Sequence, residues 1–191
     1  LCNEINAHIV ELIGRLGARA MGLHTLSSCV LFGEQLFLHE DGRRVDIGRV
    51  GRITAVNDEI MALMLAAGTI PVLAPLAKDR AGGRLNCNAD TAAGEVASAL
   101  SAEKLVVVSD THGIRADPSD PESRISDATE AQIQSMVDDG TISAGMLPKV
   151  DACVRALDAG VPRAHIIDGR FAHSLLLEIF TPEGVGTVIH K

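Results

Sequence analysis

Three polar segments of this sequence carry side chains that could bind a phosphate or another anion. Residues 86–90 (Asn-Cys-Asn-Ala-Asp) open a predicted helix, and the free N–H groups at a helix start favour an anion. Residues 109–113 (Ser-Asp-Thr-His-Gly) follow an apolar strand, and residues 168–170 (Asp-Gly-Arg) follow the last long strand. Ligands of open α/β sheets bind beyond the carboxyl ends of such strands. These segments are therefore the first candidates for a ligand site.

Asn86, Asp90 and Lys149 are the kinds of residue that phosphoryl transfer uses. The reaction depends mainly on positioning and charge neutralisation. A lysine can stabilise charge on the transferring group, an aspartate can hold that lysine, and an asparagine can donate a hydrogen bond to the substrate. The sequence has no Walker A loop and no G-x-G-x-x-G, H-E-x-x-H or G-x-S-x-G motif. Phosphate binding would therefore rely on other residues.

Each of these residues also has a structural explanation, which the sequence leaves open. Asn86 and Asp90 could belong to a helix cap, and Ser109 and Asp110 could be ordinary turn residues. Lys149 could be a solvated lysine in the first turn of a helix.

The spacing of histidine and cysteine predicts no metal site. His165 and His173 have no third ligand at a suitable spacing, which favours structural roles. The four cysteines, at positions 2, 29, 87 and 153, form no C-x-x-C pair. We expect them to be reduced, buried thiols.

The elements that must position these residues alternate along the chain. Helices are predicted over residues 1–17, 57–67, 90–100, 129–137, 145–157 and 173–180. Strands are predicted over residues 18–23, 69–73, 104–110, 163–167 and 186–190, with a hairpin over 29–53 that turns at Asp41-Gly42. The strand predicted over 104–110 has a continuous apolar run, Leu-Val-Val-Val, at 105–108, as in a parallel strand covered on both faces. The alternation predicts an α/β fold with a mostly parallel sheet.

Composition excludes several classes of function. The chain has 191 residues and a formal net charge of −8, which argues against general nucleic-acid binding. It has no Trp and no Tyr, so stacking on bases is not expected. No apolar run has the length of a membrane span and no signal peptide is visible, so we expect a cytoplasmic protein.

Several of these segments together resemble the N-acetylglutamate kinases of the amino-acid kinase family. The run at 86–90 resembles their N-x-N-A-D signature, and residues 106–114 resemble the strand and loop of their nucleotide lobe. Residues 140–150 resemble the G-M-x-x-K-V segment, and residues 164–170 and 183–187 resemble the closing motifs. Matching segments run from about Val50 to the end of the chain.

The resemblance implies a three-layer αβα sandwich of the carbamate kinase-like fold. It implies an enzyme that uses MgATP to phosphorylate the side-chain carboxylate of N-acetyl-L-glutamate, the second step of arginine biosynthesis. Residues 1–101 would be the rest of the acetylglutamate-binding lobe, and residues 102–191 the nucleotide-binding lobe. A homodimer is expected for the full-length form.

The site residues follow from the same motifs. Lys149 would stabilise the transferring phosphoryl group, Asp90 would organise the catalytic lysines, and Asn86 would contact acetylglutamate. The nucleotide would be bound by Ser109, Asp110, Gly113, Gly145 and Met146.

Some members of the family are inhibited by arginine, and the motifs of their arginine site match His165, Glu178 and Gly184. The resemblance therefore leads to the hypothesis that L-arginine inhibits this protein by feedback. These members usually carry an N-terminal helix that joins dimers into a hexameric ring, and no such helix is seen in this sequence.

Two departures from the family pattern affect the expected activity. The opening strand of the family, with its lysine and glycine-rich loop, does not appear before Leu1, so we expect an N-terminally truncated chain with poor activity. Residues 24–28 also differ from the loop found in many members, which leaves the substrate open. The alternatives are a related kinase with another carboxylate substrate, or a non-catalytic module that binds arginine or a nucleotide.

Overall fold

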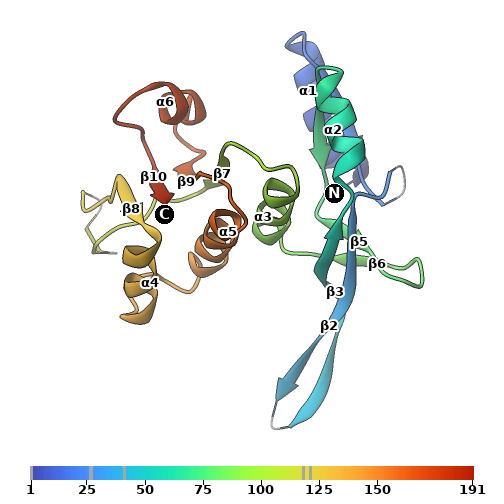
Figure 1. Cartoon of the computed structure of the whole chain (residues 1–191), viewed down its shortest axis with the longest axis horizontal. Helices are drawn as coiled ribbons and strands as arrows, with labels where there is room; N and C mark the ends of the chain where they lie inside the picture. Colours follow the sequence, from blue (N-terminus) through green and yellow to red (C-terminus); the bar gives the residue numbers. More distant parts are fainter. Residues whose placement is uncertain (1, 26–27, 41, 118, 121) are drawn as a thin grey trace. The chain divides into compact units, whose positions relative to one another are not determined.

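A computed structural model describes residues 2–25, 28–40, 42–117, 119–120 and 122–191 of the chain. The chain forms two compact units, Leu1–Ala92 and Ala93–Lys191, and Figure 1 labels most of their helices and strands. The boundary lies inside α3 (Ala89–Ala99), whereas the division predicted from the sequence follows this helix, at residue 101. The predicted turn residue Asp41 and part of the loop at 24–28 lie outside the described residues.

The first unit contains a small parallel sheet with two helices. β1 (Arg19–Leu23) pairs in parallel with β4 (Thr69–Leu73) along its whole length. A π-helical turn (Cys2–Asn6) leads into α1 (Ala7–Arg15), which packs on β1, and α2 (Asp58–Ala66) packs on β4. The buried Asn6 side chain donates a hydrogen bond of 2.8 Å to the Val72 carbonyl. This bond ties the start of α1 to the sheet.

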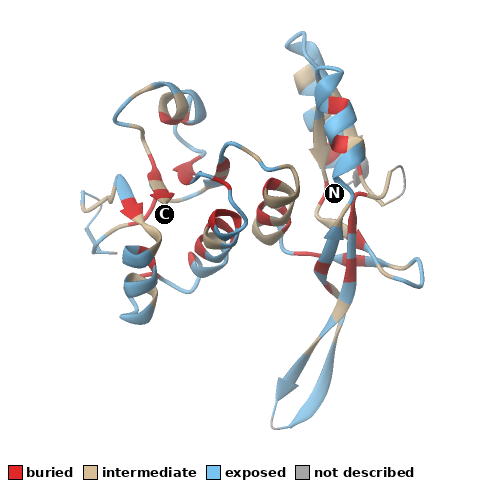
Figure 2. Cartoon of the chain, in the orientation of Figure 1, coloured by how far each residue is buried: buried red, intermediate tan, exposed pale blue. Residues whose placement is uncertain are grey.

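A long antiparallel hairpin forms the rest of the first unit. It consists of β2 (Leu31–Glu40) and β3 (Arg43–Val56), and it closes into a small barrel with β5 (Leu76–Lys78) and β6 (Arg84–Asn86). Leu31, Ala77 and Leu85 are fully buried inside it. The far end of the hairpin is exposed, as Figure 2 shows.

The second unit is built on a four-stranded sheet in the order β7-β9-β10-β8. Its strands are β7 (Leu105–Ser109), β9 (Arg163–Asp168), β10 (Thr187–His190) and β8 (Asp127–Thr129). β7 and β9 are parallel, and so are β8 and β10, whereas β9 and β10 are antiparallel. Ser109 pairs with Asp168, so the carboxyl ends of β7 and β9 meet at one edge of the sheet.

Three further helices pack around this sheet. They are α4 (Glu130–Asp138), α5 (Leu147–Asp158) and α6 (Ser174–Phe180). α4 begins where Thr129 and Gln132 form a capping box: the Gln132 N–H donates to Thr129 Oγ1, and the Thr129 N–H donates to Gln132 Oε1. Ile133 of this helix is fully buried in the core, together with Leu157, Ile166 and Ile189.

The predicted α/β class is confirmed, and most predicted elements lie within a few residues of their expected bounds. Two predictions were wrong. The residues of β5, β6 and β8 were not predicted as strands, because segments of three residues show no period. Val108 is 58% exposed, whereas Leu105 and Val107 are buried, so one face of β7 is not covered. Among the described residues, no helix is long and apolar enough to cross a membrane.

Candidate functional site

The second unit has a pocket at the carboxyl end of β7. Its volume is about 380 Å³. Asp110, Gly113 and Met146, which the sequence predicts as nucleotide-binding residues, line this pocket. The other lining residues are Thr111, Ile114, Arg115, Thr141, Ile142, Ser143 and Arg170. Apolar, hydroxyl and guanidinium groups thus share one concave surface, as in sites that bind a ring and a charged group together.

One wall of the pocket is the turn that follows β7. Ser109 ends the strand, and its hydroxyl oxygen lies 3.3 Å from Thr111 Oγ1. Gly113 has a φ of +89°, a value that favours glycine. A Cβ at this position would lie 2.6 Å from Thr187 Oγ1. The pocket wall therefore packs directly on Thr187.

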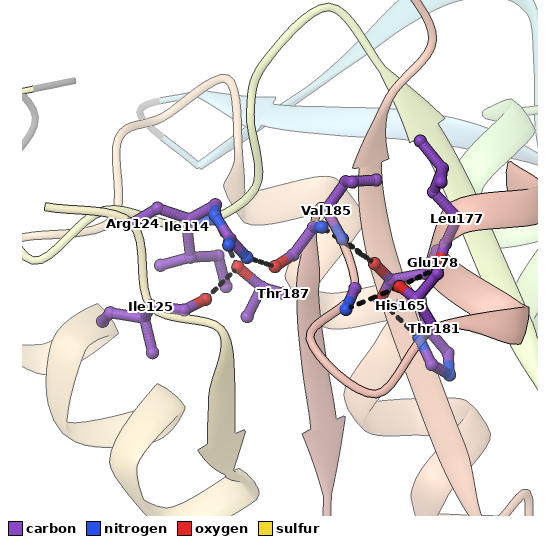
Figure 3. Close-up of polar contacts among 11 residues, drawn as sticks. Ile114, Arg124, Ile125, His165, Leu177, Glu178, Thr181, Val185 and Thr187 are labelled. Carbon is purple, nitrogen blue, oxygen red and sulfur yellow. Dashed lines mark hydrogen bonds and ion pairs between the residues drawn. The ribbon is translucent and has the colours of Figure 1, made fainter. Parts of the chain in front are cut away.

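Thr187 holds this wall from behind. Its side chain is fully buried. Its Oγ1 accepts a hydrogen bond of 2.8 Å from the Ile114 N–H and donates one of 2.6 Å to the Ile125 carbonyl, as Figure 3 shows. Ile114 and Ile125 lie at the two ends of the loop that comes before β8. Thr187, the first residue of β10, therefore holds both ends of this loop.

Another part of the pocket wall is the turn that precedes α5. Ile142 and Met146 are buried, and the Met146 N–H donates to the Ser143 carbonyl at 2.9 Å. Gly145 belongs to this turn but is not among the described residues that line the pocket. Lys149 is half-buried in the first turn of α5, and its N–H donates to the Met146 carbonyl at 3.0 Å. The predicted catalytic lysine is therefore close in the fold to the pocket wall.

A buried carboxylate lies at the sheet edge beside the pocket. Asp168 is 2% exposed and accepts hydrogen bonds from Arg170 Nε at 3.0 Å and from Arg170 Nη2 at 2.8 Å. His112 Nδ1 lies 3.2 Å from Asp168 Oδ2. The hydrogen bonds from Arg170, helped by the charges of Arg170 and His112, lower the pKa of Asp168 from 3.8 to about 2. Asp168 is therefore a fixed negative charge at neutral pH.

The predicted substrate residues lie in the first unit. Asn86 ends β6 and is exposed, and Asp90 is half-buried in the first turn of α3. Asn88 has a cap-like role, because its Oδ1 accepts the Thr91 N–H at 2.9 Å. Cys87 is buried, and burial raises the pKa of its thiol. The partnership of Asp90 with Lys149, which belongs to the second unit, remains a prediction.

The residues predicted to bind arginine meet in a second pocket. His165 Nδ1 lies 2.7 Å from Glu178 Oε1, and both side chains are buried. Glu178 Oε2 accepts the N–H groups of Val185 and Gly186 at 2.7 and 2.8 Å, as Figure 3 shows. Burial alone would raise the pKa of Glu178, but these hydrogen bonds together lower it. The carboxylate is thus stabilised in its charged form.

This second pocket has a volume of about 290 Å³ and is lined by His165, Glu178 and Gly184. Gly184 has a φ of +59°, and a Cβ there would lie 2.7 Å from Glu178 Oε2. Lys104 and Arg163 also line the pocket. His165 Nε2 is buried and has no hydrogen-bond partner among the described residues. A ligand that reaches this atom would satisfy it.

The structure adds site residues that the motifs had not identified. Thr141, Ser143 and Arg115 line the first pocket, but isolated hydroxyl and arginine residues in loops carry no signal of their own. Arg170 lies in the segment 168–170, which the sequence indicates as a candidate ligand site because it follows a strand. The sequence gives no specific role for Arg170. No group of three or more His, Cys, Asp or Glu side chains in the described part of the chain could hold a metal ion.

Comparison with known proteins shows the family of the chain. The sequence profile described as "Amino acid kinase family" matches residues 1–168. The chain belongs to the amino acid kinase family. It is 44% identical over 190 residues to an acetylglutamate kinase of Methanothrix thermoacetophila, and this match covers 99% of the chain and 66% of the relative. The predicted resemblance is thus confirmed, and the chain spans slightly less than two thirds of that relative.

Solved structures confirm the predicted fold of this amino acid kinase family member. N-acetylglutamate synthase of Neisseria gonorrhoeae, complexed with coenzyme A and L-arginine, is 28% identical with a TM-score of 0.77, over 91% of this chain and 38% of that chain. Carbamate kinase of Giardia is 16% identical with a TM-score of 0.68, over 98% of this chain and 68% of that chain. The carbamate kinase-like αβα fold is therefore established.

Proposed function

We propose that this chain belongs to an ATP-dependent kinase that phosphorylates the side-chain carboxylate of N-acetyl-L-glutamate, in the second step of arginine biosynthesis. The identity of 44% to an acetylglutamate kinase carries the proposal. The pocket between residues 110 and 146 supports it, because the predicted nucleotide residues Asp110, Gly113 and Met146 converge there.

In this reaction a carboxylate oxygen of the substrate attacks the γ-phosphorus of ATP. A new P–O bond forms, the bond to the β-phosphate oxygen breaks, and ADP leaves, so that N-acetylglutamyl 5-phosphate is the product. Lys149 would stabilise the negative charge on the transferring group, at the start of a helix whose dipole acts in the same sense. Asp90 would hold the lysines in position and Asn86 would bind acetylglutamate. Mg²⁺ would arrive with the nucleotide as part of the co-substrate.

The same proposal covers the organisation of the protein. Residues 1–101 would provide the acetylglutamate-binding lobe, and residues 102–191 the nucleotide-binding lobe with Ser109 and Gly145 near the nucleotide. The full-length protein would be a cytoplasmic homodimer. There are two alternatives: a related kinase with another carboxylate substrate, and a non-catalytic module. The assay must distinguish both from an acetylglutamate kinase.

The test supplies MgATP and one acceptor, which is acetylglutamate, glutamate, aspartate or aminoadipate. Hydroxylamine then traps any acyl phosphate that forms as a hydroxamate. The assay compares this chain with the full-length product of its gene. Hydroxamate from acetylglutamate alone is expected, and Asp90→Ala should abolish it. If neither form yields hydroxamate while ADP or arginine still binds, the chain is a non-catalytic module.

A second proposal concerns the pocket of His165, Glu178 and Gly184, where we infer that L-arginine binds as a feedback inhibitor. The buried, unsatisfied Nε2 of His165 suits a ligand that donates N–H groups. Glu178 offers a negative charge, while Lys104 and Arg163 offer positive charges to an α-carboxylate. A solved structural relative is complexed with L-arginine.

Calorimetric titration tests this second proposal. Arginine should bind, and citrulline, which lacks the positive charge of the side chain, should bind at least about tenfold more weakly. Asp90→Ala should leave arginine binding intact, because Asp90 is not among the residues that line this pocket. Equal binding of arginine and citrulline would contradict the assignment.

A further inference from the structure

The cluster of Asp168, Arg170 and His112 has no part in the reaction proposed above. Asp168 ends β9, and the Asp168–Arg170 contact lies at the sheet edge where β7 also ends. Both Arg170 and Asp110, which follows β7, line the pocket of about 380 Å³. Arg170 of this cluster is therefore part of the wall of this pocket, and its contact with Asp168 needs a chemical explanation.

The geometry of Arg170 is fixed by Asp168. Asp168 Oδ1 accepts the Arg170 N–H at 2.8 Å and the Nε–H at 3.0 Å, and Asp168 Oδ2 accepts an Nη2–H at 2.8 Å. Two parallel bonds between a guanidinium and a carboxylate set the plane and the direction of the guanidinium. An arginine held in this way loses little further conformational freedom when it binds a ligand.

The side chains of the cluster differ in burial. The Asp168 side chain is 3% exposed, whereas the Arg170 side chain is 63% exposed. The His112 side chain, 3.2 Å from the same carboxylate, is 53% exposed. A buried anion thus supports two nitrogen-bearing side chains that remain open to a ligand. Arg170 lines the pocket, and an ion pair that served only to stabilise the fold would not need its guanidinium there.

We infer that Arg170 binds the phosphate chain of the nucleotide and that Asp168 is its positioning residue. This inference rests on the proposed function, because it takes the pocket to be the nucleotide site. A planar guanidinium matches phosphate oxygens through two N–H bonds. Asp110 on the same wall adds a negative charge near Arg170, which favours a nucleotide that brings Mg²⁺ with its phosphates.

The experiment compares the binding of ADP and of adenosine by calorimetry, in the wild type and in variants of the same chain. Arg170→Met should weaken ADP binding by about 10- to 100-fold, the range for a hydrogen bond to a charged group, and change adenosine binding by less than about twofold. Arg170→Lys should recover part of the ADP affinity, because it restores the charge but not the planar fork. Asp168→Asn should weaken ADP binding less than Arg170→Met, and the double variant should be no weaker than Arg170→Met alone.

Arg155→Met is the matched control. Arg155 also pairs with an aspartate, with Nε 2.8 Å from Asp151 Oδ2, but this pair is exposed on α5 and does not line the pocket. The control should bind ADP as the wild type does. Circular dichroism verifies that each variant is folded.

The outcomes separate this inference from the function on which it rests. Wild-type ADP affinity in Arg170→Met, or an equal loss for ADP and adenosine, would overturn the role of Arg170 and leave the kinase proposal intact. A wild-type chain that binds neither ligand would overturn the nucleotide pocket and this inference together. Selective loss of ADP binding, without hydroxamate from any acceptor, would support the role of Arg170 and contradict the kinase.

Discussion

Replacing Thr187 by valine should destabilise the second unit and loosen the wall of the first pocket. Valine has nearly the shape of threonine but no hydroxyl, so the substitution removes two hydrogen bonds and leaves the packing in place. The Ile114 N–H would lose its acceptor at 2.8 Å, and the Ile125 carbonyl would lose its donor at 2.6 Å. Thr187 is 0% exposed, so water cannot easily replace either bond.

The expected magnitude follows from these two groups. A buried polar group left unsatisfied costs about 1 to 3 kcal/mol, so Thr187→Val should lower the free energy of unfolding by about 2 to 4 kcal/mol after partial relaxation. Thr187→Ser keeps the hydroxyl and loses one methyl group, which costs about 1 kcal/mol. The prediction is therefore sharpest in its ranking: Thr187→Val should lose more unfolding free energy than Thr187→Ser.

Urea unfolding followed by far-ultraviolet circular dichroism measures this difference, because a chain without Trp or Tyr has no useful intrinsic fluorescence. Hydrogen exchange gives a local readout, since the Ile114 amide should exchange faster in Thr187→Val and stay protected in Thr187→Ser. ADP should also bind more weakly to the valine variant, because Gly113 and Ile114 line the pocket. A valine variant as stable as the serine variant would refute the reasoning.

Three other perturbations test separate contacts. Gly113→Ala should lower the melting temperature more than Gly140→Ala: both glycines have positive φ, at +89° and +79°, but only a Cβ at 113 would meet a neighbouring atom within 4 Å; equal losses would exclude the clash with Thr187. Because the pKa of Asp168 falls to about 2 in the folded state, its ionised form contributes stability above pH ~4 that is lost as the pH drops toward 2. The difference in unfolding free energy between the wild type and Asp168→Asn should therefore shrink over that range, and a constant difference would argue against the shifted pKa. Glu178→Gln should weaken arginine binding by about tenfold or more in calorimetry while ADP still binds, and unchanged arginine affinity would remove Glu178 from that site.

Local patterns were sufficient to predict one part of the site. Asp110 and Gly113 could be found because polar residues directly after an apolar strand lie at the ligand-binding edge of an α/β sheet. His165 and Glu178 could be found only through the family motifs, since nothing in their spacing of 13 residues indicates a contact of 2.7 Å. This contact is made by the packing of α6 on β9, not by local propensity.

Other features were not predictable from local pattern. The role of Thr187 depends on Ile114, which lies 73 residues earlier in the chain. β8 has three residues, too few to show a period, and it becomes a strand because β10 lies beside it. Val108 belongs to a continuous apolar run, yet it is exposed, because the sequence of one strand does not reveal which of its faces other elements cover.

The position of β10 limits the order in which the second unit can fold. This strand of four residues, Thr187–His190, lies between β9 and β8, although both of those strands precede it in the chain. A ribosome therefore completes β7, β8 and β9 before it supplies the strand that joins them. Until then, the open edges of β8 and β9 are exposed to other chains and to chaperones. The addition of β10, and not the earlier pairing of β7 with β9, therefore completes the sheet.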